Sequence, residues 1–263
     1  MRTIIFIPAR YASTRYPGKP LAELRQRDGG TKSLIQMSWE AACQVKGVDD
    51  VYVATDDARI AEAAEAFGAK VVMTAESCDN GTARCADALA NIDDKPDLII
   101  NFQGDAPLTP PWFVEALIEA MQTDKTVGMA TPVLRCDRQT YDAFKNDRAN
   151  GRVGGTTAVF DTQMNALYFS KEVLPYIGPG KVEEPIPVFH HVGVYAYHPD
   201  ALAQYVASPI CALEQLEGLE QLRFLHNGIP VRCVEVDAKG RVFWELNNPS
   251  DVPLIEKALE ALS

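Results

Sequence analysis

Short apolar runs alternate with amphipathic segments along the first half of the chain. The apolar runs have the length and composition of buried strands and occupy residues 3–8, 51–54, 70–73, 97–102 and 127–133. Between them, apolar residues recur every three or four positions, which is typical of one helix face, over 34–45, 60–67, 82–92 and 114–121. Because strands and helices alternate, the pattern predicts an α/β fold with a mostly parallel, doubly wound sheet covered by helices on both faces.

The pattern changes near residue 135. Residues 135–155 are polar and rich in turn formers, and Gly178-Pro179-Gly180 indicates a long excursion. Within this part of the chain, residues 166–169 and 188–197 have the composition of strands. We therefore expect residues 135–197 to form a smaller inserted lobe rather than a free linker.

The alternation of helix and strand resumes after the lobe. We expect a helix over 213–227, a strand over 231–236 and a final helix that begins at Pro249, with Asn248 as its N-cap. There is no internal repeat and no low-complexity segment. The chain, 1–263, is expected to be a single domain with the lobe as an insertion.

The charge balance excludes one class of partner. The chain has 36 acidic residues and 25 Lys or Arg among its 263 residues, so its formal net charge is −11. A general nucleic-acid binder needs many cations that neutralise phosphates, so no nucleic-acid partner is expected. A local basic cluster can still attract an anionic small molecule.

Neither a membrane nor an oxidising compartment is expected from the sequence. No apolar stretch is long enough to cross a bilayer, and the apolar run within residues 1–8 is too short for a secretory signal. The six cysteines are scattered and form no Cys-x-x-Cys pair. We therefore expect a reduced, cytoplasmic protein without a cysteine zinc site.

Candidate chemistry lies where the strands end. In such a sheet, ligands bind at the carboxyl ends of strands, here the loops 8–21, 103–108 and 237–248. The first loop places Arg10 and Lys19, with Arg15 between them, directly after the first buried strand of an acidic protein. Such a cluster of cations is typical of an anion-binding turn.

Two common nucleotide motifs are absent from this loop. A Walker loop needs Gly where Ser13 stands and Ser or Thr where Pro20 stands. No Gly-x-Gly-x-x-Gly fingerprint is found either, which disfavours a nicotinamide-dependent dehydrogenase.

The first loop, Pro8-Ala9-Arg10 to Lys19-Pro20-Leu21, resembles the Pro-Ala-Arg-x-x-Ser-x-Arg-x-Pro-Gly-Lys-Pro-Leu signature of bacterial cytidylyltransferases that activate acidic sugars. The nearest match is the 3-deoxy-manno-octulosonate cytidylyltransferase (CMP-Kdo synthetase) family. Six further blocks follow in the family's order: Ala54-Thr55-Asp56-Asp57, Gly81-Thr82-Ala83-Arg84, Asn101-Phe102-Gln103-Gly104-Asp105, Tyr168-Phe169-Ser170, His191-Val192-Gly193-Val194-Tyr195-Ala196-Tyr197 and Leu219-Glu220-Gln221-Leu222-Arg223. The resemblance implies a nucleotide-diphospho-sugar transferase-like fold and a homodimer with contacts within 135–197.

The resemblance also implies a reaction. CMP would pass from CTP to the anomeric hydroxyl of an acidic eight-carbon sugar, with release of pyrophosphate, for lipopolysaccharide biosynthesis. By resemblance, Arg10 and Lys19 stabilise the triphosphate and the departing pyrophosphate, and Ala9 and Ser13 close round the nucleotide. Arg84 would lie near the cytosine.

Metal and sugar residues follow from the same resemblance. Asp105 would hold Mg²⁺, which prefers oxygen ligands, and Asn247 aligns with the family's second metal-binding Asp. His191 and Lys171 are candidates to meet the sugar carboxylate. The residues implied to surround the sugar are Gln103, Lys171, His191, Tyr195, Glu220 and Gln221.

Four positions depart from the family pattern. Ala83 and Ala106 replace carboxylates, Lys171 replaces a planar Arg, and Asn247 replaces the metal-binding Asp. An amide oxygen coordinates Mg²⁺ without a negative charge, so we expect one metal position to weaken, and Glu245 is a candidate to compensate. Because the departures fall on both the sugar and the metal side, we hypothesise a modified acceptor, 8-amino-3,8-dideoxy-manno-octulosonate.

Three other functions stay open on the sequence alone. The acceptor is alternatively the unmodified octulosonate or a nonulosonic acid. A non-catalytic sugar-nucleotide sensor is the third alternative, although the retention of Lys19 and Asp105 argues against it.

Overall fold

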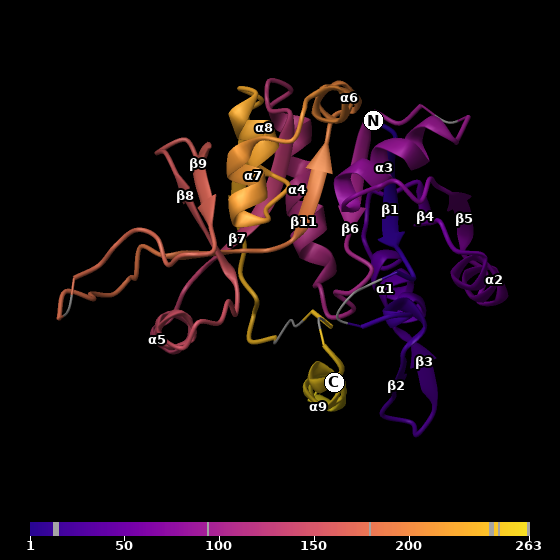
Figure 1. Cartoon of the computed structure of the whole chain (residues 1–263), viewed down its shortest axis with the longest axis horizontal. Coiled ribbons are helices and arrows are strands. Elements are labelled where there is room, and N and C mark those ends of the chain that lie inside the picture. The colour runs from indigo at the N-terminus through magenta and orange to yellow at the C-terminus, as the bar shows by residue number, and fades with distance from the viewer. Residues whose placement is uncertain (13–15, 94, 179, 242–244, 247, 262–263) are drawn as a thin grey trace.

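A mixed ten-stranded sheet organises the chain (Figure 1). The computed structural model describes residues 1–12, 16–93, 95–178, 180–241, 245–246 and 248–261. Its strands are β1 (Thr3–Ala9), β2 (Glu23–Arg25), β3 (Thr31–Ser33), β4 (Asp50–Thr55), β5 (Lys70–Met73), β6 (Leu98–Phe102), β7 (Met129–Arg135), β8 (Thr156–Phe160), β9 (Ala166–Ser170), β10 (Phe189–His191), β11 (Val194–Tyr197) and β12 (Val231–Glu235). Its α-helices are α1 (Leu34–Ala42), α2 (Ala58–Ala66), α3 (Gly81–Ala90), α4 (Pro111–Thr123), α5 (Arg138–Ala149), α6 (Pro199–Ala207), α7 (Ala212–Glu217), α8 (Leu222–His226) and α9 (Val252–Ala261), with 3-10 turns at Lys19–Leu21 and Pro249–Asp251.

The sheet confirms the predicted α/β fold. Its strand order is β5-β4-β1-β6-β11-β7-β10-β8-β9, and β12 pairs with β7. The pairs β5–β4, β4–β1, β1–β6 and β12–β7 are parallel. The pairs that involve β8 to β11 are antiparallel.

Both faces of the sheet are buried, as its apolar strands predict. Ile4 and Phe6 of β1 pack into a cluster with residues of α3, α6 and α8, whereas Ile5 and Ile7 pack with residues of α1, α2 and α4. All four side chains have no exposed surface. Successive side chains of a strand point to opposite faces, so a strand covered on both sides needs an unbroken apolar run.

Two expected elements are each divided in two. The helix predicted over 213–227 is wrong as a single helix, because Gly218 ends α7 in the left-handed conformation (φ 60°) and α8 begins at Leu222. The strand predicted over 188–197 forms β10 and β11, which pair with β7 in registers that differ by two residues.

Several elements were not predicted. Helix α5 forms within a stretch expected to be turn-rich, and its N-cap Asp137 accepts a hydrogen bond from the Thr140 backbone N–H at 2.7 Å. Helix α6, strand β8 and the β2–β3 hairpin were missed as well. Strands β8, β9 and β10 continue the main sheet, and the segment between β9 and β10 extends away from the rest of the molecule (Figure 1).

The C-terminal helix packs against the N-terminal half of the chain. The final helix was expected to begin at Pro249, but α9 begins at Val252, after a 3-10 turn over Pro249–Asp251. Asn248 is the N-cap of that turn, and its backbone N–H donates to the Asp251 carboxylate at 2.7 Å. Ile255 of α9 is fully buried with Leu24 and Leu246 in a small apolar cluster. This packing fixes the path of residues 245–246, which precede the helix.

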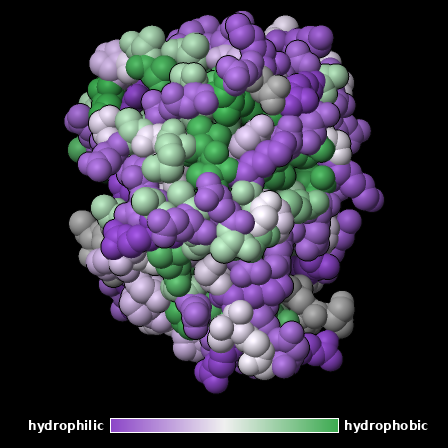
Figure 2. Space-filling view, turned by 90° about the vertical axis from the view of Figure 1, so that its right-hand side faces the viewer, coloured by the Kyte–Doolittle hydropathy of each residue, from purple (hydrophilic) through white to green (hydrophobic). Residues whose placement is uncertain are grey.

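The surface of the described residues matches the polar composition of the chain. Among the helices of the described ranges, none combines the length and the hydrophobicity that a membrane span requires. On the face seen in Figure 2, polar side chains interrupt the hydrophobic ones. All six cysteines are free thiols.

Candidate functional site

The three loops singled out in the sequence meet at one edge of the sheet. Gly104, which follows β6, lies so close to the end of β1 that a Cβ placed on it would be 2.7 Å from the Pro8 carbonyl oxygen. The backbone N–H of Leu246 donates to the carbonyl oxygen of Asp105 at 2.8 Å. The carboxyl ends of β1 and β6 and the segment before α9 therefore form one continuous site.

The centre of this edge is a contact between two predicted catalytic residues. Lys19 Nζ donates to Asp105 Oδ2 at 2.6 Å, and the two side chains are 15% and 25% exposed. Lys19 begins a 3-10 turn after Gly18, whose φ of 70° favours glycine and whose N–H donates to Tyr11 at 2.9 Å. The turn thereby carries Lys19 across to the end of β6.

Two further residues that are predicted to contact the nucleotide lie at the end of β1. Ala9 is buried as the last residue of β1, and Arg10 is exposed directly after it. Ser13 lies outside the described residues, as does Asn247 of the predicted metal pair.

Arg84 is the most buried cation among the predicted site residues. Its side chain is 2% exposed and forms an ion pair with Asp56 at 3.0 Å. Arg84 Nη1 also donates to the Thr74 hydroxyl at 2.5 Å. Asp56 follows β4 and belongs to one of the quoted family blocks, a signal that pointed to this position without assigning its role. The ion pair fixes the guanidinium at the ends of β4 and β5.

On the sugar side, His191 is a buried, neutral imidazole. The Thr131 hydroxyl lies 3.0 Å from His191 Nε2 and within 3.1 Å of two backbone carbonyl oxygens, which only accept hydrogen bonds. The hydroxyl proton goes to a carbonyl, so Nε2 carries the ring proton and donates it to Thr131. Nδ1 then accepts from the Thr156 hydroxyl at 3.1 Å and from the Gln221 amide at 3.5 Å.

The surroundings of His191 keep it uncharged. Burial, and to a lesser extent the neighbouring His190, lower the pKa of His191 from 6.5 to about 3. His191 thus offers hydrogen bonds and not a positive charge. Thr131 and Thr156, which fix its tautomer, were missed because single threonines on strands carry no sequence signal.

Tyr195, Gln221 and His191 form one group in the structure. The Tyr195 hydroxyl donates to Gln221 Oε1 at 3.4 Å, and the rings of Tyr195 and His191 stack with centroids 5.7 Å apart. Burial, followed by the charges of Glu220 and Glu245, raises the pKa of Tyr195 well above its usual value. Glu245 Oε1 lies 3.4 Å from the position of a Cβ on Gly193. Two carboxylates, Glu220 and Glu245, therefore lie close to the Tyr195 phenol.

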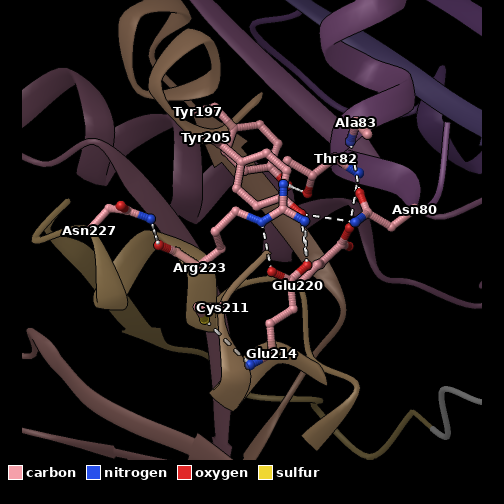
Figure 3. Close-up of polar contacts among 10 residues, drawn as sticks. All are labelled: Asn80, Thr82, Ala83, Tyr197, Tyr205, Cys211, Glu214, Glu220, Arg223 and Asn227. Atoms are coloured by element: carbon pink, nitrogen blue, oxygen red, sulfur yellow. Dashed lines mark hydrogen bonds and ion pairs between the residues drawn. The ribbon is translucent and has the colours of Figure 1, made fainter. Parts of the chain in front are cut away.

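Glu220 connects this group to helix α3. Its carboxylate accepts the backbone N–H of Thr82, in the first turn of α3, at 3.0 Å (Figure 3). Thr82 Oγ1 and the Tyr197 hydroxyl are 2.7 Å apart, and the Tyr197 hydroxyl accepts from Asn101 at 3.3 Å. Gln103 donates in turn to Asn101 Oδ1 at 3.2 Å. Hydrogen bonds therefore link the predicted sugar residues Gln103 and Glu220 through buried side chains.

Lys171 approaches from the end of β9. Its backbone N–H donates to Glu217 Oε2 at 2.8 Å, and its ammonium lies 2.9 Å from the position of a Cβ on Gly218. Lys171 is therefore placed beside the turn that leads into Glu220 and Gln221.

A metal ion would depend on few protein ligands at this site. Among the described residues, no group of three or more His, Cys, Asp or Glu side chains is arranged to hold a metal ion. Asp105 supplies one carboxylate, in contact with Lys19. This donor set suits Mg²⁺, which commonly binds one or two carboxylates together with water and substrate phosphates.

Comparison with known proteins shows which family the chain belongs to. The cytidylyltransferase family matches residues 4–235. A 3-deoxy-manno-octulosonate cytidylyltransferase of Maricaulis maris is 43% identical, over 99% of this chain and 98% of its own length. An 8-amino-3,8-dideoxy-manno-octulosonate cytidylyltransferase of Shewanella loihica is 40% identical, over 98% of this chain and 99% of its own.

A solved structure gives the same result. CMP:2-keto-3-deoxy-manno-octonic acid synthetase, determined in complex with CTP, superposes with a TM-score of 0.85 at 34% identity and covers 99% of both chains. The resemblance recognised in the sequence blocks is confirmed. The chain belongs to the cytidylyltransferase family, in the group that includes the 3-deoxy-manno-octulosonate cytidylyltransferases.

Proposed function

We propose that this chain transfers CMP from CTP to the anomeric hydroxyl of an octulosonate-type sugar acid. In this reaction the hydroxyl oxygen bonds to the α-phosphorus, the bond from that phosphorus to the bridging oxygen breaks, pyrophosphate leaves and the hydroxyl proton is released. The observation that carries the proposal is the Lys19–Asp105 contact of 2.6 Å at the carboxyl ends of β1 and β6. Phosphoryl chemistry asks a protein mainly for positioning and for neutralisation of charge.

The nucleotide would bind along the ends of β1 and β4. Arg10 and Lys19 neutralise the triphosphate and the leaving pyrophosphate, and Ala9 and Ser13 close round the nucleotide. Arg84, fixed by its ion pair with Asp56, faces the cytosine. A preorganised cation loses little entropy when the ligand arrives, which favours binding.

Asp105 would hold Mg²⁺, and Asn247 is the second proposed ligand. When bound, the ion would neutralise phosphate oxygens of the nucleotide. Lys19, which contacts Asp105 in the structure, would then be free to meet a phosphate oxygen.

The sugar would bind beside the group of polar side chains around Tyr195 and Gln221. Gln103, Tyr195, Glu220 and Gln221 address its hydroxyls, and Lys171 supplies the charge that meets its carboxylate. His191 is neutral, so it contributes a hydrogen-bonding ring and holds the amide of Gln221 in position.

For the acceptor we propose the 8-amino sugar, with unmodified 3-deoxy-manno-octulosonate as the alternative. Glu220 and Glu245 both lie close enough to Tyr195 to raise its pKa, and an ammonium group is a natural partner for such carboxylates. The 43% identical relative is named for the unmodified sugar and supports the alternative. Competition between the two sugars decides, because a higher kcat/KM for the unmodified sugar contradicts the 8-amino assignment.

Pyrophosphate release tests the activity itself. Purified protein is mixed with CTP, Mg²⁺ and a panel of octulosonic and nonulosonic acids, and release is expected with an octulosonate. Strict absence of turnover with every acid, together with retained binding of CTP, would identify a sensor instead.

We also propose a homodimer that works in the cytoplasm. The segment between β9 and β10 extends from the body and exposes 80% of Tyr176, as expected of a contact arm within residues 135–197 (Figure 1). The six free thiols suit a reducing compartment. Light scattering should give a dimer for the native chain and a monomer for Tyr176→Asp, and a dimer for both would refute the arm.

A further inference from the structure

The backbone of Lys171 is bound by one acidic and one basic side chain. Its N–H donates to Glu217 Oε2 at 2.8 Å, and its carbonyl oxygen accepts from Arg148 Nε. Glu217 is the last residue of α7 and Arg148 lies near the end of α5, so two helices far apart in the sequence contact the same residue. Hydrogen bonds to charged groups are stronger than those between neutral groups, so the two contacts together fix the Lys171 backbone.

Glu217 also accepts hydrogen bonds from the end of β9. Ser170 Oγ donates to Glu217 Oε1 at 2.7 Å, and the Tyr168 hydroxyl donates to the same oxygen at 3.5 Å. Ser170 Oγ accepts in turn the backbone N–H of Glu172 at 3.0 Å. One carboxylate therefore organises the chain from the end of β9 to the residue after Lys171.

Arg148 fixes this segment from the other side. Its Nη2 donates to the carbonyl oxygen of Gly155, which precedes β8, while its Nε donates to that of Lys171. The guanidinium also lies 5.5 Å from the centre of the Phe144 ring. Because a guanidinium has several N–H donors in one rigid plane, it holds both carbonyl oxygens at once. Arg148 thereby joins α5 to the segments beside β8 and β9.

The side chain of Lys171 lies along the turn that follows α7. Its ammonium is 2.9 Å from the position that a Cβ on Gly218 would occupy, so the missing Cβ leaves room for it. Glycine is favoured at this position, since its φ is 60°. Two consecutive residues therefore seat Lys171: Glu217 binds its backbone, and Gly218 makes space for its ammonium. The same turn leads into Glu220 and Gln221.

We propose that Glu217 and Arg148 are positioning residues that fix Lys171 so that its ammonium meets the carboxylate of the sugar. The part that concerns the sugar rests on the proposed function, whereas the contacts on the Lys171 backbone do not depend on it. A side chain that is ordered before the ligand arrives has less freedom to lose on binding, so this arrangement favours binding of the sugar.

Two substitutions of Glu217 separate its acceptor oxygens from its charge. Glu217→Met removes both oxygens, and the KM for the sugar should rise about three- to tenfold, which is the cost of ordering one long side chain. The kcat and the KM for CTP should stay native. Glu217→Gln keeps one oxygen for the Lys171 N–H and can donate to Ser170 Oγ, so it should lie close to the native protein. Arg148→Met frees the Lys171 carbonyl and should raise the KM for the sugar by a similar factor.

A double variant shows whether Glu217 acts through Lys171. Lys171→Met alone removes the proposed partner of the sugar carboxylate and should raise the KM for the sugar by about 30-fold or more. In that background, Glu217→Met should change the KM by less than about twofold, because the group that it positions is gone. Multiplying effects in the double variant would overturn the proposal, since Glu217 would then act independently of Lys171.

Hydrogen exchange at the Lys171 amide reports the contact without any activity. In protein labelled with nitrogen-15 lysine, the Lys171 signal is assigned with Lys171→Arg. Its exchange with solvent should be at least about tenfold faster in Glu217→Met and native in Glu217→Gln. It should also stay native in Arg148→Met, where the N–H keeps its partner. Native exchange in Glu217→Met would overturn the proposal.

Matched control variants lie outside this segment. Glu115 of α4 accepts the backbone N–H of another lysine, Lys46, at 3.1 Å. Glu115→Met should therefore affect the Lys46 amide and leave the Lys171 amide and the KM for the sugar native. Arg138→Met removes a cation from the helix that carries Arg148, where it forms an exposed pair with Asp142, and should leave both readouts native.

The remaining outcomes are also decisive. If Glu217→Met does not fold, Arg148→Met decides, and a native KM for the sugar in that variant overturns the proposal. Faster Lys171 exchange in an active Glu217→Met enzyme with a native KM for the sugar overturns it as well. The expected exchange rates in a protein that turns over no sugar would refute the proposed function, and with it the role of Lys171 towards the sugar, while the contacts on the Lys171 backbone would be confirmed.

Discussion

Gly104 offers a direct test of how tightly the site is built. It follows β6, and a Cβ there would lie 2.7 Å from the Pro8 carbonyl oxygen, 3.4 Å from Ile7 Cγ2 and 3.5 Å from Ile35 Cδ1. The closest of these atoms belongs to the backbone at the end of β1, which cannot turn aside as a flexible side chain can. Gly104→Ala must therefore separate the loop that carries Lys19 from the loop that carries Asp105.

The size of the effect follows from the contact. Relief of the overlap requires a backbone movement of about 0.5 Å, and overpacking of this kind costs about 1–3 kcal/mol in the free energy of unfolding. A displacement of this order between two groups that must act together is expected to lower kcat by about 10- to 100-fold. The hydrogen bond from Ser38 Oγ to the Gly104 carbonyl oxygen, at 3.0 Å, resists the movement.

Urea unfolding and steady-state pyrophosphate release measure the two effects. Gly178→Ala is the matched control, because the nearest atom to a Cβ there is Lys181 Cδ at 3.6 Å, an ordinary contact with a flexible side chain. The control should match the native protein in both assays. Native stability and native kcat in Gly104→Ala would show that the two loops are not held in register by this contact.

Three further predictions concern single side chains. Lys19→Met and Asp105→Asn should each lower kcat by about 10²- to 10³-fold. The free energy of unfolding should change by about 1 kcal/mol or less, because the Lys19–Asp105 contact is partly exposed. Native turnover in either variant would refute the proposed charge neutralisation. Burial lowers the pKa of His190 from 6.5 to about 4. Between pH 6.5 and pH 4 the unfolded chain therefore binds more protons at this residue than the folded chain does, so the free energy of unfolding should fall as the pH is lowered through this range. Urea titrations should show a shallower fall in His190→Gln, and an equally steep fall would contradict the reasoning. Phe224→Ala, which empties a fully buried position between two tyrosine rings, should reduce stability by about 3–5 kcal/mol, and a loss below 1 kcal/mol would contradict the packing.

The sequence was most informative where one physical rule decides the outcome. An unbroken apolar run such as residues 3–8 has few alternatives to a strand buried on both faces, and β1 was found there. The rule that ligands bind at the carboxyl ends of parallel strands singled out the two loops that carry Lys19 and Asp105, and these side chains meet in the structure. Neither prediction needed knowledge of a specific tertiary contact.

Prediction failed where a tertiary contact decides. At the division between β10 and β11, the hydroxyl of Thr131 on β7 lies within 3.1 Å of the Val192 and Val194 carbonyl oxygens. Nothing local to residues 188–197 indicates this partner. The break at Gly218 is different, because glycine is disfavoured within helices and common at their ends. The sequence therefore carried a local signal for this break, and the φ of 60° at Gly218 shows that it ends α7.

The hydrogen bond from Leu246 to Asp105 has a consequence for biosynthesis. A nascent chain emerges from its N-terminus, so β1 and β6 are available to fold long before residues 245–261 have been synthesised. The loop that bears Asp105 receives its last backbone partner only when this final segment arrives. The Leu246–Asp105 hydrogen bond therefore forms after the sheet strands have been synthesised, and the docking of α9 is expected to be a late step in the assembly of this edge.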